Sequence, residues 1–387
     1  MITTGFSYIA ILFLISGTIA ALEGRKKHRI FKIIPGIVIL YFAIMLLSTF
    51  GLWTKTDSIN ATYSAVKGNL LPSMIFLLLL KGDIRQIAAL GPKMILAFVT
   101  ASVSIGIGFV VTFLIMKSWL PGTAWMTFAA LSGSWMGGTG NMVAVQGALS
   151  IPDSSMGYTL LMDSIDYAIW VMLLLAFVPL APKFNAWTKS NTKLIDEVSA
   201  KIEANAKNPD AKIDTASLTF LIGAGLAAAA LAQYLAGFLP VSDFFSATTW
   251  TVLIVTVMGV VGAMTRLGGV AGSSELGNVL LYGIVALIAS RANFAELTQA
   301  PLFIAAGFII LGIHGLIMVI AAKLFRLDLF SCGVASLANI GGVASAPILA
   351  AAYSRALIPI GVLMAMLGYI IGTGGGLLVG KILSSLL

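Results

Sequence analysis

The sequence contains few residues of the kinds that build disulfides, metal centres or soluble surfaces. Cys332 is the only cysteine, which excludes a disulfide within the chain and a cysteine-based metal site. The two histidines, His28 and His314, are too few for a histidine-based metal site. Charged residues make up only 10% of the chain, far below their share in a soluble globular protein. The sequence therefore excludes an ordinary soluble domain.

Apolar residues take the place of the missing charge. Hydrophobic residues make up 59% of the 387 residues, and the mean hydropathy is +1.02. This length holds about a dozen helices of roughly 20 residues joined by short loops. No region has the composition of a separate soluble domain. The composition predicts an all-α polytopic protein with about 12 transmembrane segments in a lipid bilayer.

The basic residues are placed where a membrane protein needs them. The formal net charge of +8 is compatible with a nucleic-acid binder, but many basic residues lie at the ends of apolar runs, where they orient a chain in the bilayer. No nucleic-acid partner is expected. The first apolar run, Gly5 to Leu22, has no Lys or Arg before it. It is followed by the basic residues Arg25, Lys26, Lys27 and Arg29. This order predicts a retained helix with an outside N-terminus.

A charged segment divides the remaining apolar runs into two halves of equal number. The runs before it span Phe31 to Trp53, Asn69 to Leu80, Pro92 to Met116, Ala124 to Leu149 and Met156 to Leu180. The runs after it span Ala216 to Leu239, Thr248 to Met264, Leu276 to Ser290, Pro301 to Leu324, Ser331 to Ala352 and Leu357 to Leu386. We therefore expect a first repeat half at 1–182, a charged linker at 183–214 and a second repeat half at 215–387.

The fifth run of each half contains a pair of glycines in its middle. The first, at 124–149, includes "GSWMGGTGNMVAVQGAL", and the second, at 331–352, includes "LANIGGVASAPILAAA". Gly137-Gly138 and Gly341-Gly342 occupy corresponding positions, which indicates an internal duplication. Paired glycines also occur where membrane helices pack closely. Unwound backbone at membrane depth is tolerated only where it lines a cavity or is buried in protein. Interrupted helices in corresponding positions therefore favour the binding site of a secondary transporter.

Hydrogen-bonding side chains flank both glycine pairs. The predicted substrate-binding set is Ser132, Ser134, Gly137, Gly138, Asn339, Gly341, Gly342 and Ser345. Half-helices that start near Asn141 and Ser345 would direct their N-terminal amides to the middle of the membrane, where they attract anions. The second motif contains no Lys or Arg. This pattern favours a small organic anion or a peptide-like solute as the substrate.

Two carboxylates lie in the sixth run of the first half. Asp163 and Asp166 are three residues apart, so they share one face of a helix, and no Lys or Arg lies within a turn of them. They can share a proton, or bind Na⁺ with help from Asn141 and Thr139. The alternative is a helix end where both acids are solvated. Na⁺ at this pair is the only metal expected, and Na⁺ or H⁺ as coupling ion is the only cofactor.

An enzymatic function is not expected. The serines near the glycine pairs have no buried His or Lys nearby in the sequence to act as a base. An intramembrane aspartic protease needs acids on two helices, whereas Asp163 and Asp166 share one. His314 lies in the middle of a run, where it can relay protons or be held by a hydrogen bond as an ordinary buried histidine.

The two glycine motifs and the last run, "GVLMAMLGYIIGTGGGLLVG", resemble the DUF819 family of bacterial membrane proteins over nearly the whole chain. The resemblance implies kinship with bile-acid-type sodium symporters and cation/proton antiporters. In that group two discontinuous helices cross at mid-membrane in a mobile core domain, beside a panel or dimerisation domain. A homodimer is implied on the same basis.

The orientation of the halves follows from the positive-inside tendency. Parallel halves would place Arg266, Lys323, Arg326 and Lys381 outside, against that tendency, so inverted repeats are favoured. The resulting hypothesis is a sodium or proton symporter of a small organic anion or peptide-like solute that works by alternating access. The alternatives are a Na⁺/H⁺ antiporter and an energy-coupling membrane subunit of an enzyme complex.

Overall fold

The computed structural model describes residues 1–25, 31, 35–190, 213–242, 245–294, 297–354 and 357–387. Over these residues the chain forms helices joined by short connections, and the only bridge between extended residues joins Ile2 to Trp53. The predicted basic residues Lys26, Lys27 and Arg29, together with His28 and positions 191–212 of the predicted linker, lie outside the described residues.

The helices before the linker follow the predicted apolar runs with a few differences. They are α1 (Gly5–Gly24), α2 (Gly36–Thr49), α3 (Asp57–Leu79), α4 (Ile84–Ile87), α5 (Gly91–Met116), α6 (Ala124–Gly137), α7 (Thr139–Ala148), α8 (Met156–Phe177) and α9 (Ala181–Thr188). Helix α3 begins well before the predicted Asn69, because the Thr56 hydroxyl accepts a hydrogen bond from the Ile59 amide at 3.3 Å and caps a polar first turn. Helix α9 makes the start of the predicted linker helical.

The helices after the linker are α11 (Thr215–Ala236), α12 (Ala247–Ala263), α13 (Ser273–Ala289), α14 (Ala300–Phe325), α15 (Leu329–Ile340), α16 (Gly342–Tyr353) and α17 (Ile358–Ser384). Short 3₁₀ helices are η2 (Ala88–Leu90), η3 (Asp153–Ser155), η4 (Val178–Leu180) and η5 (Arg266–Gly269). Helix α11 starts with a capping box in which Asp214 and Ser217 bond reciprocally. The Ser217 amide and hydroxyl bonds lower the pKa of the Asp214 carboxyl.

Six helical segments of the described chain are long and apolar enough to cross a membrane. They are Gly5–Gly24, Gly91–Met116, Asp153–Thr188, Thr215–Ala236, Ala300–Phe325 and Ile358–Ser384. The other apolar helices, such as α2, α12 and α13, have 10–17 residues. The structure therefore agrees with a polytopic, all-helical membrane protein. About twelve crossings and inverted halves stay predictions.

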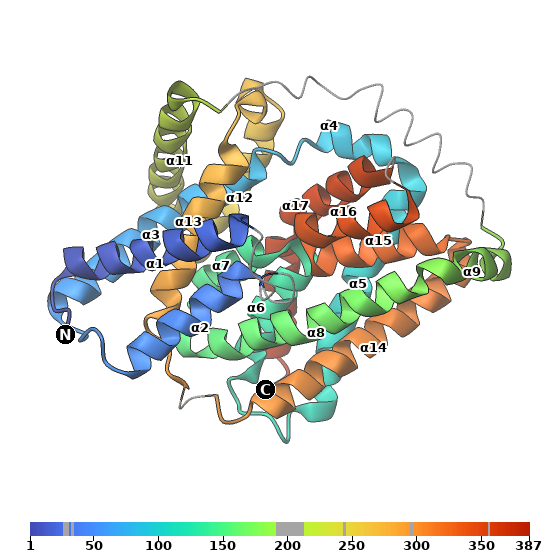
Figure 1. The fold of residues 1–387 in the computed structure, drawn as a ribbon, viewed down its shortest axis with the longest axis horizontal. Helices are drawn as coiled ribbons and strands as arrows, with labels where there is room; N and C mark the ends of the chain where they lie inside the picture. The colour runs from blue at the N-terminus through green and yellow to red at the C-terminus, as the bar shows by residue number, and fades with distance from the viewer. Residues whose placement is uncertain (26–30, 32–34, 191–212, 243–244, 295–296, 355–356) are drawn as a thin grey trace.

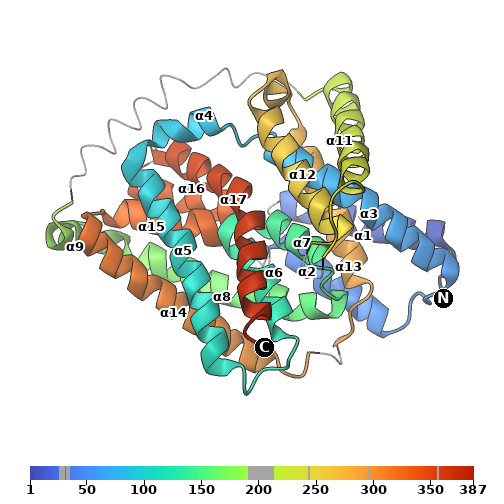
Figure 2. The same ribbon diagram turned by 180° about the vertical axis from the view of Figure 1, so that it is seen from behind.

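The helices form two groups that mix the two halves of the sequence (Figure 1). The first helix group contains α1, α2, α3, α11, α12 and α13, with α3 packed against the last three. The second helix group contains α5, α6, α8, α9 and α14 to α17, and in it α5 packs on α14 and α6 on α17. Helix α7 lies between the groups and contacts α3, α12 and α17. The view from behind shows the same division (Figure 2).

Candidate functional site

Both glycine pairs interrupt a helix, as the sequence predicts. Helix α6 ends at Gly137, and Gly138 has φ +88° and ψ 173° before α7 begins. That backbone conformation is essentially restricted to glycine. In the second half, α15 ends at Ile340 and α16 begins at Gly342, whose φ is +57°. Only glycine adopts such left-handed values without steric cost, so each break is fixed by its own residues.

The two breaks lie next to each other in the second helix group. A methyl group added to Gly342 would lie 4.0 Å from the Cα of Gly138. Within the described residues, no side chain caps the first turn of α7 or of α16, and Gly138 and Thr139 are only half-buried. A helix N-terminus carries a partial positive charge of roughly half an elementary charge. Two uncapped N-termini that start side by side make a place suited to an anion.

Helix α17 packs against the first break through glycines. A methyl group on Gly372 would lie 2.7 Å from the Cα of Gly137, and one on Gly376 would lie 2.9 Å from the Cα of Gly133. A methyl group on Gly374 would meet nothing within 4 Å. The glycines of "GTGGG" therefore serve close packing where they face α6, and Gly374 faces away from it.

The side chain of the asparagine beside each break bonds to the backbone rather than facing an open site. Asn141 Nδ2 donates to the Gly137 carbonyl at 2.6 Å, and its Oδ1 accepts from the Thr373 hydroxyl at 2.6 Å. Asn339 Nδ2 donates to the Ala335 carbonyl at 2.9 Å, and its Oδ1 accepts from the Ser102 hydroxyl at 2.7 Å. The Asn141 bond satisfies the carbonyl of Gly137, which the end of α6 leaves without an intrahelical partner. The Asn339 bond goes to a carbonyl one turn earlier within α15.

The carboxylate of Asp163 lies against the last turn of α6. The Ser134 hydroxyl is 3.0 and 3.1 Å from its two oxygens, and the Trp135 indole Nε1 donates to Oδ1 at 3.0 Å. Ser134, predicted to bind substrate, is thus a partner of the predicted ion ligand. These donors stabilise a charged carboxylate and fix α8 beside the first break.

Asp166 is buried without a hydrogen-bond partner. Its side chain is 0% exposed, and within the described residues neither carboxylate oxygen has a hydrogen-bond partner. It faces α14, where a methyl group on Gly307 would lie 1.7 Å from Oδ2. A buried carboxylate with no partner is very costly as a free charge. It must either carry a proton or have a cation beside it.

The structure brings together some of the predicted site residues and separates others. Asp163 lies against the end of α6 and Asp166 faces α14, and Asn141 bonds to Thr373 instead of to the acids. Thr139 lies at the first break, half-buried. Ser132 donates locally to the Ala129 carbonyl at 2.8 Å.

The second break holds the last of the predicted serines. Ser345 donates to the Leu337 carbonyl at 3.4 Å, so its hydroxyl spans the break between α15 and α16. A methyl group on Gly341 would lie 1.9 Å from the Ser345 oxygen and 2.4 Å from a ring carbon of Tyr167. The second break is therefore closely packed around its first glycine.

His314 is fully bonded in its buried position. Its Nδ1 lies 2.7 Å from the Ser104 hydroxyl and its Nε2 lies 2.8 Å from the Ser336 hydroxyl. The Ser104 hydroxyl also donates to the Ala101 carbonyl, and Ser336 accepts from the Trp170 indole at 2.8 Å. We assign the ring proton to Nδ1 from this network, because each hydrogen-bond donor then faces an acceptor and each acceptor faces a donor. Serine hydroxyls on both nitrogens thus hold the ring in place.

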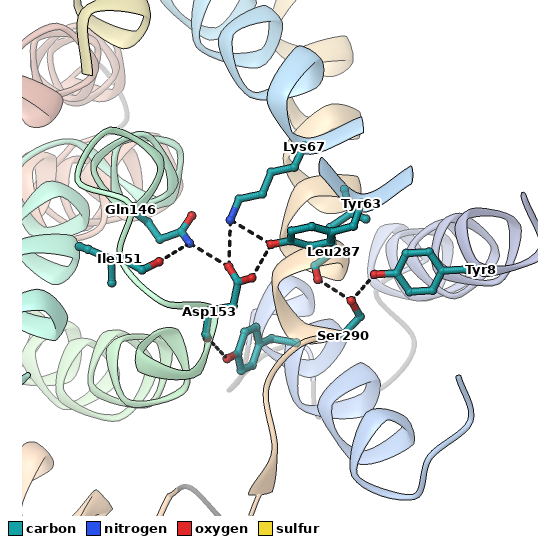
Figure 3. Close-up of polar contacts among 9 residues, drawn as sticks. Tyr8, Tyr63, Lys67, Gln146, Ile151, Asp153, Leu287 and Ser290 are labelled. Carbon is teal, nitrogen blue, oxygen red and sulfur yellow. Dashed lines mark hydrogen bonds and ion pairs between the residues drawn. The ribbon is translucent and has the colours of Figure 1, made fainter. Parts of the chain in front are cut away.

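A polar cluster that no sequence pattern indicated lies between α3 and the loop after α7 (Figure 3). Lys67 Nζ lies 2.9 Å from Asp153 Oδ1, and the Tyr63 hydroxyl donates to Oδ2. Gln146 Nε2 also donates to Asp153 Oδ1, at 2.9 Å. Lys67 and Tyr63 lie 86 and 90 positions from Asp153 in the chain, so no local spacing could have joined them to it.

Comparison with known proteins identifies the family. Residues 10–386 match the family described as "Protein of unknown function (DUF819)", so the chain belongs to the DUF819 family. The chain is similar to the "Uncharacterized membrane protein YjcL" of Bacillus subtilis (strain 168), with 26% identity over 386 residues, 95% of this chain and 93% of that protein. The relative is thus a membrane protein matched along almost its full length.

Proposed function

We propose that this member of the DUF819 family is an ion-coupled secondary transporter that moves a small organic anion or peptide-like solute by alternating access. The observation that carries the proposal is the meeting of two uncapped helix N-termini next to the end of α6, where the Asp163 carboxylate is held. Interrupted helices of this kind form ion and substrate sites in secondary transporters. The coupling cation, Na⁺ or H⁺, binds at Asp163 and Asp166, and the solute binds at the breaks.

Electrostatics couples the two ligands in this proposal. An anion at the breaks is repelled by a charged Asp163, and Asp166 adds a second negative charge whenever it loses its proton. A cation bound between these acids removes that repulsion. The affinity for the anion therefore rises when the cation is bound, and by linkage the affinity for the cation rises equally when the anion is bound.

The alternatives account for fewer of these features. A Na⁺/H⁺ antiporter would use the two acids but would leave the paired, uncapped N-termini of α7 and α16 without a ligand. An energy-coupling subunit would need partner chains in order to act. We place the transporter in the bacterial inner membrane as a homodimer, with movement of the second helix group past the first providing alternating access. This arrangement rests on the kinship that the sequence motifs imply.

Thermal unfolding of the purified chain in detergent tests the cation site. The midpoint is measured in Na⁺, K⁺ and choline at constant ionic strength for the wild type, Asp163→Asn and Asp166→Asn. Ser164→Ala is the matched control, because Ser164 lies on the same helix and donates only to the Leu160 carbonyl. A cation present at 100 times its dissociation constant adds about 2.7 kcal/mol. We expect Na⁺ alone to raise the midpoint, and both Asn variants to lose the effect.

Two other outcomes would change the proposal. A midpoint that responds to pH through the same acids, and not to Na⁺, would make the pair a proton site. If neither Asn variant differs from Ser164→Ala in any of these solutions, the ion site is wrong. Transport by the purified chain alone in liposomes would exclude an obligate subunit.

A further inference from the structure

We infer that the polar cavities between α3 and the C-terminal end of α7 bind a small organic carboxylate that also carries an amide or hydroxyl hydrogen. We call these cavities the vestibule. The inference that the vestibule binds such a ligand rests on its own geometry. As the place where the transported solute first binds, it rests on the proposed function. It is separate from the breaks, since Gln146 lies roughly 10 Å along α7 from the residues that begin the helix.

Two adjoining cavities form the vestibule. One has a volume of about 610 Å³ and is lined by residues of α3, α7, α11 and α12, so it lies between the first helix group and α7. The other has a volume of about 460 Å³. Tyr63, Ser64 and Asp153 line both. Sites for small molecules have volumes of about 300 to 1,000 Å³, so each cavity is large enough for a compact solute.

Positive charge exceeds negative charge in this vestibule. Its walls carry Lys55, Lys67 and Arg291 against Asp153 alone. Asp153 is paired with Lys67. In the described part of the chain, neither Lys55 nor Arg291 has a carboxylate within ion-pair distance. Two unpaired cations in one vestibule favour an anionic ligand.

Arg291 is held in a position to bind a carboxylate. Its Nη1 donates to Asn60 Oδ1 at 2.7 Å, and its guanidinium lies 4.4 Å above the ring of Tyr63. These two contacts orient the guanidinium group but use only part of its five donors. The remaining donors can bind a carboxylate in the planar, two-bond arrangement that arginine prefers.

Gln146 adds a second requirement, which is that the ligand carries a hydrogen-bond donor. Its side chain is 1% exposed, and its Nε2 donates to the Ile151 carbonyl at 2.8 Å and to Asp153. This settles the orientation of the amide, because the flipped form would put its oxygen against two acceptors. Gln146 lines the larger cavity, and within the described residues its oxygen Oε1 is buried and without a hydrogen-bond partner. In Figure 3 it turns away from Ile151 and Asp153.

The two requirements together define the class of ligand. A buried carbonyl oxygen without a donor costs about 1–3 kcal/mol, and a ligand N–H or O–H removes that cost. Arg291 and Lys55 supply the charge for a carboxylate. An N-acylated amino acid or a hydroxy acid meets both conditions, whereas a plain fatty acid or an inorganic anion meets only the second.

Binding of two nearly isosteric acids to the full-length protein in detergent tests this inference. N-acetylglycine carries a carboxylate and an amide N–H, and levulinate has a CH₂ group in place of that N–H. Calorimetry is done in choline buffer on the Asp166→Asn variant, so the result does not depend on the proposed cation site. We expect N-acetylglycine to bind about tenfold more tightly than levulinate, the value of a hydrogen bond at a buried acceptor. We expect the uncharged methyl ester of N-acetylglycine not to bind.

Two variants locate the site. Arg291→Met should weaken N-acetylglycine binding about tenfold, whereas the exposed Arg266→Met, outside the vestibule, should leave it unchanged. Gln146→Leu should remove the preference for N-acetylglycine over levulinate. The comparison of ligands needs no variant of either lining residue, so it remains decisive if one of these proteins does not fold. Equal affinity for the two acids, or no saturable binding of either, would refute the inference, and water would then be the partner of Gln146.

Discussion

Helix α17 offers a matched pair of glycine substitutions that measures how tightly it packs on the first break. A methyl group on Gly372 would lie 2.7 Å from the Cα of Gly137 and 2.9 Å from the side-chain carbonyl carbon of Asn141. A methyl group on Gly374, two residues along the same helix, would meet nothing within 4 Å. Both substitutions add the same group to the same helix, so only the packing differs.

The two substitutions are expected to change the free energy of unfolding in opposite directions. Non-bonded carbon atoms prefer about 3.5–4.0 Å, so Gly372→Ala must open a gap of about 1 Å between α17 and the break. Overpacking of this kind costs about 1–3 kcal/mol, and the upper end applies here because the neighbour is backbone that no rotamer change can remove. Replacing glycine by alanine within a helix contributes about 1 kcal/mol in the other direction. Gly372→Ala should destabilise by up to about 2 kcal/mol, and Gly374→Ala should stabilise by up to about 1 kcal/mol.

Unfolding of the two variants in the same detergent, followed by helix content, measures the difference. Gly372→Ala should also weaken the response to the coupling ion, because its methyl group displaces Asn141 and the end of α6, where Ser134 holds Asp163. Gly374→Ala should leave that response unchanged. Equal stabilities for the two variants would show that α17 does not lie as close to the first break as the structure places it.

Three further predictions concern the first break, the proposed cation site and a helix cap. Gly138→Ala should destabilise the protein by about 1–3 kcal/mol, because φ +88° with ψ 173° excludes a Cβ. Thermal unfolding measures this loss, and an unchanged midpoint would contradict the strained geometry. Gly307→Ala should abolish any stabilisation by the coupling ion, since its methyl group would lie 1.7 Å from Asp166 Oδ2; a retained ion response would place the ion elsewhere. Ser246→Ala should cost about 1 kcal/mol through loss of the capping box at α12, seen as faster amide exchange at Thr249; unchanged exchange would show that the cap is not formed.

The helices and their interruptions could be predicted because each depends on neighbours in the sequence. Apolar length sets where α1, α5 and α14 run, and the glycine pairs set where two helices break, because φ values such as that of Gly138 are a property of the residue itself. The early start of α3 was missed because its first turns are polar and depend on the hydroxyl of Thr56 for a cap.

The site was predictable only in part, because most of its contacts join distant parts of the chain. The spacing of Asp163 and Asp166 placed them on one helical face. The partner of Asn141, by contrast, is Thr373, 232 positions away, and the pairing of Lys67 with Asp153 joins separate helices. No periodicity connects such residues, so the predicted contact of Asn141 with the acids rested on adjacency in the sequence alone.

The interruption of a helix explains why a cation and an anion would bind so close together under the proposed function. In a continuous helix the peptide dipoles cancel in the middle, and only the ends carry partial charge. The break at Gly138 creates a negative end on α6 and a positive end on α7 within one residue. Asp163 lies against the last turn of α6 and adds to the negative side, where a cation is favoured.

The N-terminus of α16 adds to the positive side, since Gly342 lies next to Gly138. A cation near Asp163 and an anion at the N-termini then attract each other across a few ångströms in a medium of low dielectric constant, where that attraction is far stronger than in water. Each bound ligand acts as the counterion of the other, so each is less costly to bind when the other is present. A pair of breaks without the acids would favour an anion alone, and the acids without the breaks would favour a cation alone. Their combination is therefore the physical reason to propose symport.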